Sequence, residues 1–207
     1  MAPGCDAIVQ VGDLFDQYVF SRYNRNPNLI TPDAEVEKAR EQAQQLWADI
    51  NKRAKWAKCW QLRGNHDARL DKRIAEKVPE ARGLLEQSIR DLYTFDGVTT
   101  VFDPTEELFL KINGETVCFQ HGHRSKLGDH ASYNGCRTVC GHSHTGGVVY
   151  RRDRRGTFWE LNAGWLGNEV ARVFAYGDQK TTKKWTLGYG LIDAQGPRFC
   201  PLKVRRD

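Results

Sequence analysis

Four short polar clusters in the sequence combine residue types that bind metal ions, and each follows an apolar run. The clusters are Gly12-Asp13-Leu14-Phe15-Asp16, Gly64-Asn65-His66-Asp67, His121-Gly122-His123 and Gly141-His142-Ser143-His144. Five of the six histidines of the chain lie inside them, and the turn Asn162-Ala163-Gly164 follows a further apolar run. Carboxylate, amide and imidazole groups in this mixture suit Mn, Fe or Zn better than Ca or Mg alone. Two such ions about 3.5–4 Å apart form a clamp for in-line phosphoryl displacement.

The apolar runs before these clusters are predicted strands, and they must bring the polar turns together. We expect strands at Ala7–Val11, 59–62, 116–120 and 138–140, each ending at one of the clusters. Open α/β sheets place their sites at the carboxyl ends of such strands, so we expect the four turns to converge on one pocket.

The rest of the chain supplies further predicted elements around these strands. Thr31-Pro32-Asp33 predicts the start of a helix that runs to about residue 58, with apolar residues such as Ala43, Leu46 and Ile50 recurring at three- and four-residue steps. Shorter helices are expected at 68–78 and 81–92, and residues 18–30 are expected to form a loop. Asn113-Gly114 predicts a hairpin between strands at 108–112 and 116–120. The remaining predicted strands are at 98–102, 148–151, 158–161, 185–192 and 199–204.

The motifs and their order resemble those of the calcineurin-like metallophosphoesterase superfamily. The matching pieces are GDxxD, GNHD, His-Gly-His and GHxH, with Asn162-Ala163-Gly164 similar to the closing Asn-Pro-Gly turn. The resemblance implies an α/β fold in which a mixed β-sheet sandwich is flanked by helices, within a single domain over residues 1–207. It implies hydrolysis of a phosphomonoester or phosphodiester by in-line attack of a metal-bound hydroxide, with two Mn, Fe or Zn ions as cofactors and a phosphoester, such as a nucleotide or nucleic acid, as substrate.

The resemblance also implies a role for each matching residue. Asp13 would bridge both metals, His144 would hold the first, and the second would be held by Asn65, His121 and His142. His66 would contact the phosphate and help to protonate the leaving oxygen, with Asp67 orienting it, since a carboxylate can aim an imidazole. His123 and Asp16 match supporting positions. Arg124 and Lys126 are candidates for contacting the substrate phosphate, although exposed basic residues are commonly only solvated.

One element of the superfamily pattern has no counterpart here. The Asp-x-His motif of an earlier strand, which supplies two ligands of the first metal, does not occur in this sequence. We interpret the chain as N-terminally truncated, with the first strand-helix unit missing. A natural variant with one metal or without activity, and replacement of the lost ligands by other residues, are the alternatives. Two protein ligands, Asp13 and His144, are few for stable binding of the first metal.

Composition sets further limits on the function. The 207 residues carry a net charge of +5, and no stretch has the roughly 18 apolar residues of a membrane span. The N-terminus has no signal-like core, which predicts a cytoplasmic protein with free thiols. Two other functions stay open: a catalytically impaired metal- or phosphate-binding scaffold, and a nucleic-acid-binding module that uses the arginines of residues 151–155.

Several of the singled-out residues also have simpler interpretations. Asp13 and Asp16 could cap a helix start. His121 and His123 could be core histidines, and His130 is expected to be structural or on the surface. The spacing Cys136-x3-Cys140-x-His142-x-His144 could form a zinc knot, but it departs from the common structural zinc patterns.

Overall fold

The computed structural model describes residues 4–22, 30–167 and 185–203, and the chain divides into two compact units, 1–106 and 107–207. Together the units contain helices and three sheets, which confirms the α/β class predicted from the sequence. The single-domain arrangement and the missing first strand-helix unit stay predictions. Among the described residues, the helices are all too short or too polar to span a bilayer.

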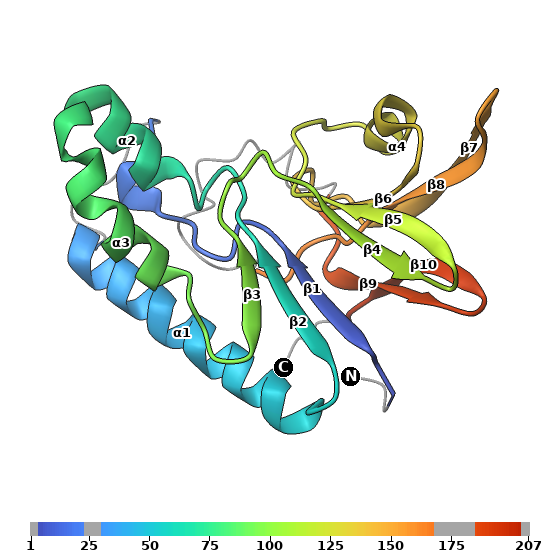
Figure 1. Cartoon of the computed structure of the whole chain (residues 1–207), viewed down its shortest axis with the longest axis horizontal. Coiled ribbons are helices and arrows are strands. Elements are labelled where there is room, and N and C mark those ends of the chain that lie inside the picture. The colour runs from blue at the N-terminus through green and yellow to red at the C-terminus, as the bar shows by residue number, and fades with distance from the viewer. Residues whose placement is uncertain (1–3, 23–29, 168–184, 204–207) are drawn as a thin grey trace. The chain divides into compact units, whose positions relative to one another are not determined.

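The first unit is a parallel three-stranded sheet with helices on one side of it (Figure 1). Its strands lie in the order β1 (Ala7–Val11), β2 (Lys58–Leu62) and β3 (Val98–Val101), and both pairings are parallel. The helices are α1 (Pro32–Arg53), α2 (Arg69–Lys77) and α3 (Arg82–Leu92), with short 3-10 turns at Tyr18–Phe20 and Pro79–Ala81. The strands and helices predicted for this part of the chain are thus present, while residues 23–29 of the predicted loop lie outside the described residues.

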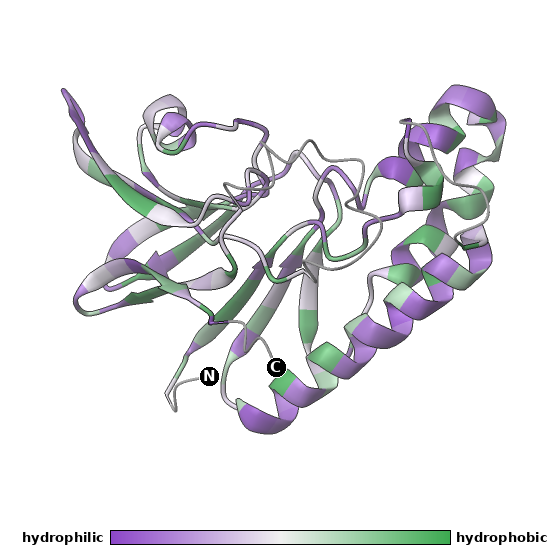
Figure 2. Ribbon diagram, turned by 180° about the vertical axis from the view of Figure 1, so that it is seen from behind, coloured by the Kyte–Doolittle hydropathy of each residue, from purple (hydrophilic) through white to green (hydrophobic). Residues whose placement is uncertain are grey.

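The long helix α1 differs from its prediction in two ways. It ends at Arg53, not near residue 58, because Lys58 already donates its backbone N–H to Asp6 O at the start of β2. Its buried face also includes Trp47, which is 1% exposed, whereas the predicted Leu46 is 42% exposed. Ala43, Trp47 and Ile50 are spaced to share one helix face, and the large indole buries more apolar area than Leu46 could. Figure 2 shows hydrophilic residues along the other side of this helix.

The second unit is built on a mixed five-stranded sheet in the order β4-β5-β6-β8-β7. Its strands are β4 (Leu108–Ile112), β5 (Glu115–Phe119), β6 (Arg137–Cys140), β7 (Gly147–Asp153) and β8 (Gly156–Asn162). The three strands β5, β6 and β8 are parallel neighbours, and antiparallel hairpins flank them. The Asn113-Gly114 turn has φ angles of 52° and 81°, as its hairpin prediction requires. A separate hairpin joins β9 (Gly188–Asp193) to β10 (Gly196–Pro201).

One helix of the second unit was not predicted. The six-residue α4 (Asp129–Asn134) is bounded by Gly128 and Gly135, which both have positive φ. Its first backbone N–H groups are satisfied by the carboxylate of Glu160 on β8, a contact thirty residues away in sequence. Because that stabilisation is tertiary, the local sequence pattern could not show it.

Candidate functional site

In the first unit, the two predicted metal-binding turns meet at one edge of the sheet. Since β1 and β2 are parallel neighbours, their carboxyl ends lie side by side and carry Asp13 and Asn65 respectively. The carboxylate of Asp13 accepts the backbone N–H of His66 through Oδ1, at 2.8 Å. Its other oxygen lies 3.9 Å from Nε2 of the same histidine. The predicted proximity of the GDxxD and GNHD motifs is therefore present in the structure.

Asp67 joins these two turns from within the core. Its carboxylate is fully buried and accepts backbone N–H groups from Asp13 and Gly64, both at 2.7 Å, and from Phe15 at 2.9 Å. Its own carbonyl accepts from the hydroxyl of Tyr93 at 2.9 Å. Asp67 thus fixes the backbone on which the candidate ligands are mounted.

The two carboxylates of this half repel one another. Burial raises the pKa of Asp67 to about 6, and the negative charge of Asp13 adds to this effect. The backbone N–H groups of Gly64 and Phe15 and the charge of Arg63 act in the opposite direction. A cation placed at Asp13 would relieve this repulsion, and such perturbed carboxyl pairs are typical of functional sites.

The carboxylate in contact with the ring of His66 is that of Asp16, whereas the sequence analysis assigned the orienting role to Asp67. Nδ1 of His66 lies 2.6 Å from Oδ1 of Asp16, whereas the carboxylate of Asp67 is occupied by backbone groups. Arg69, which the sequence analysis did not single out, donates to Asp16 O at 2.7 Å and lies 3.1 Å from Nε2 of His66. The available signal was spacing, since Arg69 stands three residues after His66 and is the first residue of α2.

The close approach of the two turns requires glycine at position 64. A Cβ atom there would lie 2.2 Å from Oδ1 of Asp13 and 2.6 Å from its backbone nitrogen. We expect Gly64→Ala to lower the free energy of unfolding by about 1–3 kcal/mol, because the backbone of Asp13 cannot yield easily. Urea unfolding measures this loss. Gly83→Ala, where a Cβ meets nothing within 4 Å, is the matched control and should lose no stability; equal stability of the two variants would contradict the packing argument.

In the second unit, the three parallel strands β5, β6 and β8 carry the remaining predicted motifs at their carboxyl ends. Nδ1 of His142 lies 3.3 Å from Nε2 of His121, with the rings edge to face. Two nitrogens bound to one tetrahedral ion at about 2.1 Å each would stand roughly 3.4 Å apart. The backbone joins the same two turns, since Gly141 donates its N–H to His121 O at 3.1 Å. The spacing of these imidazoles therefore fits a shared cation.

Asn162, at the end of β8, supports the turn that carries His142. Its amide donates to the carbonyl of Gly141 at 2.7 Å and to the hydroxyl of Ser143 at 2.9 Å. Its side-chain oxygen accepts the N–H of Gly164 at 3.0 Å. The closing Asn-Ala-Gly turn thus supports the turn that follows β6 through these hydrogen bonds.

Several of the predicted ligands, one in the first unit and two in the second, have an unusual backbone conformation. Among the described residues, the non-glycine positions with positive φ are Asp13, Gln17, Asn113, His142 and His144, so three of the five are predicted metal ligands. A side chain in this conformation costs free energy, of the order of 1 kcal/mol or more. Such strain gathers at functional sites because the surrounding structure holds it in place.

His144 and His123 have aromatic and cationic surroundings respectively. The ring of His144 is stacked on Trp165, with centroids 6.0 Å apart, and meets the edge of Trp185 at 4.5 Å. Burial, together with the positive charge of Arg124, lowers the pKa of His123. The ligand role of His144 stays a prediction, and the indoles fix the direction of its ring.

The two predicted phosphate-binding residues lie just after the His-Gly-His turn. The guanidinium of Arg124 stands 4.7 Å from the centroid of the Tyr133 ring, and its backbone N–H donates to His130. Lys126 is exposed, and its carbonyl accepts the N–H of Asp129 at 3.3 Å. Arg124 is therefore held by an aromatic ring, while Lys126 has the exposure of an ordinary solvated lysine.

A second group of potential ligands lies in the core of this unit. His130, Cys140 and Glu160 are all buried, and one ligand atom of each lies within 4.8 Å of the others. Nε2 of His130 accepts two backbone N–H groups, so its proton must reside on Nδ1, the atom nearest Glu160. A protonated Nδ1 has no lone pair for a cation. We therefore interpret this group as a buried polar cluster and not as a cation site, which places His130 in the core and not at the surface.

The remaining alternatives from the sequence find little support in these contacts. Cys136 and Cys140, of the zinc-knot pattern, lie 3.9 Å and 3.7 Å from Thr138 and Glu160, partners outside that pattern. In the arginine-rich hairpin, Arg155 pairs with Asp153 on the same turn, and Arg151 donates to Leu127 O. Two of the four arginines thus have intramolecular partners, which favours a solvated hairpin tip.

Comparisons with known proteins add a distant structural likeness. No protein-family profile and no curated protein matches the sequence. A solved structure described as a novel archaeal phosphodiesterase matches with a TM-score of 0.39 and 14% sequence identity, over 81% of this chain and 91% of that chain. A similarity this weak supports no functional argument. The proposed function therefore rests on the residues of this chain.

Proposed function

We propose that the protein is a metal-dependent phosphoesterase of calcineurin-like type, acting on a phosphomonoester or phosphodiester. The observation that carries this proposal is the pair of imidazole nitrogens of His121 and His142, 3.3 Å apart at the ends of neighbouring parallel strands. Their chemistry and spacing suit a transition metal. The order of the motifs in the sequence, and not a distance in the structure, is what joins this pair to Asp13 and Asn65 of the first unit and to His144.

The donor set fits divalent cations in each unit taken separately. Asp13 contributes a carboxylate whose charge already raises the pKa of its neighbour Asp67, so positive charge there is favoured. When bound, Mn, Fe or Zn ions would lower the pKa of a water molecule and stabilise charge on the phosphoryl oxygens. Asp67 and Asn162 would keep the ligand turns in place through their backbone hydrogen bonds.

His66 would supply proton transfer to the departing alcohol. Asp16 holds the Nδ1 side of the ring, and Nε2 is the nitrogen that would face the substrate. Arg69 presents a guanidinium beside that nitrogen and would transfer its hydrogen bond to a phosphoryl oxygen when substrate binds. Asp16, His66 and Arg69 together give this turn both a proton donor and a phosphate contact.

An assay with chromogenic phosphate esters tests this function directly. We expect the purified chain to hydrolyse bis(p-nitrophenyl) phosphate or p-nitrophenyl phosphate in the presence of Mn²⁺ or Zn²⁺, and a chelator to abolish the rate. Bound metal without hydrolysis would instead support the scaffold alternative. Absence of metal binding, measured by calorimetry, would refute the proposal. Salt-dependent binding to duplex DNA that is lost on replacing the four hairpin arginines would favour the nucleic-acid alternative.

A further inference from the structure

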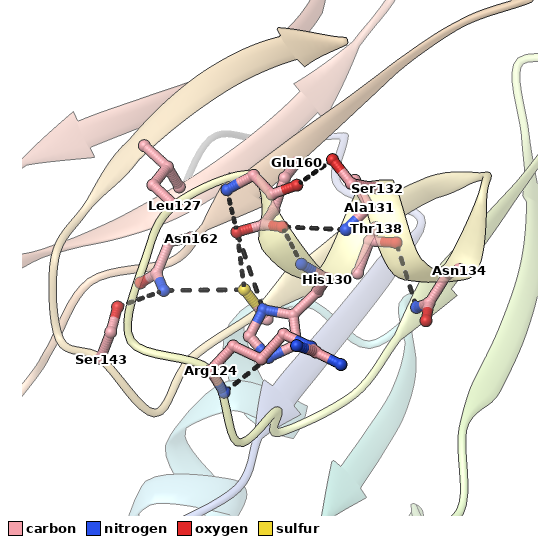
Figure 3. A network of polar contacts seen from close by, with 12 residues as sticks. Arg124, Leu127, His130, Ala131, Ser132, Asn134, Thr138, Ser143, Glu160 and Asn162 are labelled. Carbon is pink, nitrogen blue, oxygen red and sulfur yellow. Dashed lines mark hydrogen bonds and ion pairs between the residues drawn. The ribbon is translucent and has the colours of Figure 1, made fainter. Parts of the chain in front are cut away.

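A buried carboxylate on β8 organises the segment between β5 and β6. Glu160 is 1% exposed, and its side chain accepts the backbone N–H groups of Gly128 at 2.7 Å, His130 at 2.8 Å and Ala131 at 2.9 Å (Figure 3). Burial opposes ionisation, but the hydrogen bonds from His130 and these backbone groups outweigh it and lower the pKa of Glu160. The carboxylate therefore stays charged and fixes the start of α4.

The imidazole of His130 links the segment held by Glu160 to the His-Gly-His turn. The ring is 2% exposed, and its Nδ1 lies 3.7 Å from Oε1 of Glu160. On its other side, Nε2 accepts the backbone N–H groups of His123 at 3.1 Å and Arg124 at 3.0 Å. The two N–H groups that Nε2 accepts thus assign the tautomer with its proton on Nδ1, on the side of the ring nearer to Glu160.

The turn itself packs directly against this ring. Gly122 has φ +90°, and a Cβ atom on it would lie 2.6 Å from Nε2 of His130 and 2.9 Å from Cε1. The segment that follows His121 is therefore fixed by both packing and two hydrogen bonds to one imidazole. Any shift of this ring would move the backbone that carries the candidate metal ligand.

We propose that Glu160 and His130 act as positioning residues that set the His121-Gly122-His123 turn for metal binding. This inference rests on the proposed function, because it assigns them a role in preparing His121 as a ligand. Glu160 fixes the backbone of His130 through its N–H, and the ring of His130 in turn holds the two amides that follow Gly122. Partners of this kind around metal ligands orient them before the ion arrives.

Two substitutions at His130 separate its acceptor atom from its bulk. His130→Phe keeps the ring shape but removes the acceptor, whereas the amide oxygen of His130→Gln can reach the position of Nε2. We expect His130→Phe to lower the affinity for Mn²⁺ by about 10–100-fold, as loss of a ligand-orienting partner does, and His130→Gln to restore most of it. Titration calorimetry measures the affinity. Ser132→Ala, which loses only a bond to the carbonyl of Gly128 just before the same helix, is the matched control and should bind as the wild type does.

Hydrogen exchange in metal-free protein tests the positioning step without the ion. The amides of His123 and Arg124 should exchange slowly in the wild type and in His130→Gln, and much faster in His130→Phe. Unchanged protection, or lost protection with wild-type Mn²⁺ affinity, would overturn this inference alone. A wild type that binds no metal would refute the proposed function itself. Should circular dichroism show His130→Phe to be unfolded, His130→Asn replaces it, because its shorter amide cannot reach the two backbone groups.

Discussion

Replacing His66 with asparagine is expected to reduce turnover by roughly 100- to 10,000-fold while leaving the bound metal unchanged. His66 lies beside Asp13 without being one of the predicted ligands, and its ring is held by Asp16 at 2.6 Å. Asparagine has no group that can transfer the proton to the leaving oxygen. Steady-state rates with an alkyl phosphate ester, paired with metal analysis of the same sample, measure both properties.

The control for this variant lies on the next helix. Arg73 is exposed on α2, so Arg73→Gln should keep both rate and metal content. Loss of metal from His66→Asn would show that His66 is a ligand and that its assigned role is wrong. A leaving group of low pKa needs little protonation, so the rate deficit should be smaller for p-nitrophenol than for an alkyl alcohol.

Replacing Asp13 with asparagine is expected to weaken Mn²⁺ binding by more than about 100-fold, beyond the loss typical of a residue that only orients a ligand. The amide oxygen of asparagine can still accept the N–H of His66, which Asp13 does at 2.8 Å. The substitution therefore removes the negative charge while keeping the turn. Calorimetric titration with Mn²⁺ gives the affinity, and unchanged affinity would remove Asp13 from the metal site.

An NMR titration of the metal-free protein shows whether the substitution acts through charge. The pKa of Asp67, about 6 in the folded chain, is raised by burial and then by Asp13. Neutralising Asp13 should move this pKa downward while burial keeps it above the usual value. Because the raised pKa means that the folded state binds this proton more tightly, its contribution to stability is present at low pH and is lost as the pH rises through about 6. That loss should be smaller in Asp13→Asn.

The sequence predicted the strands and the turns that follow them, because those signals are local. An apolar run that ends at Gly12-Asp13 or Gly64-Asn65 identifies both the strand and the polar residues at its carboxyl end. The Asn113-Gly114 turn likewise carries its own conformational preference. Parallel pairing then explains why Asp13 and His66 meet in the first unit and why His121 and His142 meet in the second.

What the sequence did not predict depends on contacts between distant residues. Asp16 and Asp67 are both carboxylates near His66, and only the folded turn shows which of them faces the ring. The start of the short helix α4 is held by the carboxylate of Glu160 on β8. The ring of His130 packs against Gly122, a contact that only the folded chain creates. On α1 the buried residue is Trp47 and not Leu46, and its indole N–H donates to the side chain of Gln61 on β2, a contact between distant residues.

At Asp13, His142 and His144, where the backbone is left-handed, stability and the proposed function favour different residues. Glycine would adopt these angles at lower cost, so a directed search for heat resistance would tend to enrich glycine at all three places. Each such gain would delete a donor atom from the proposed reaction centre. A library screened for melting temperature alone should therefore enrich variants that are more stable but inactive. Retention of these three side chains would have to be selected separately.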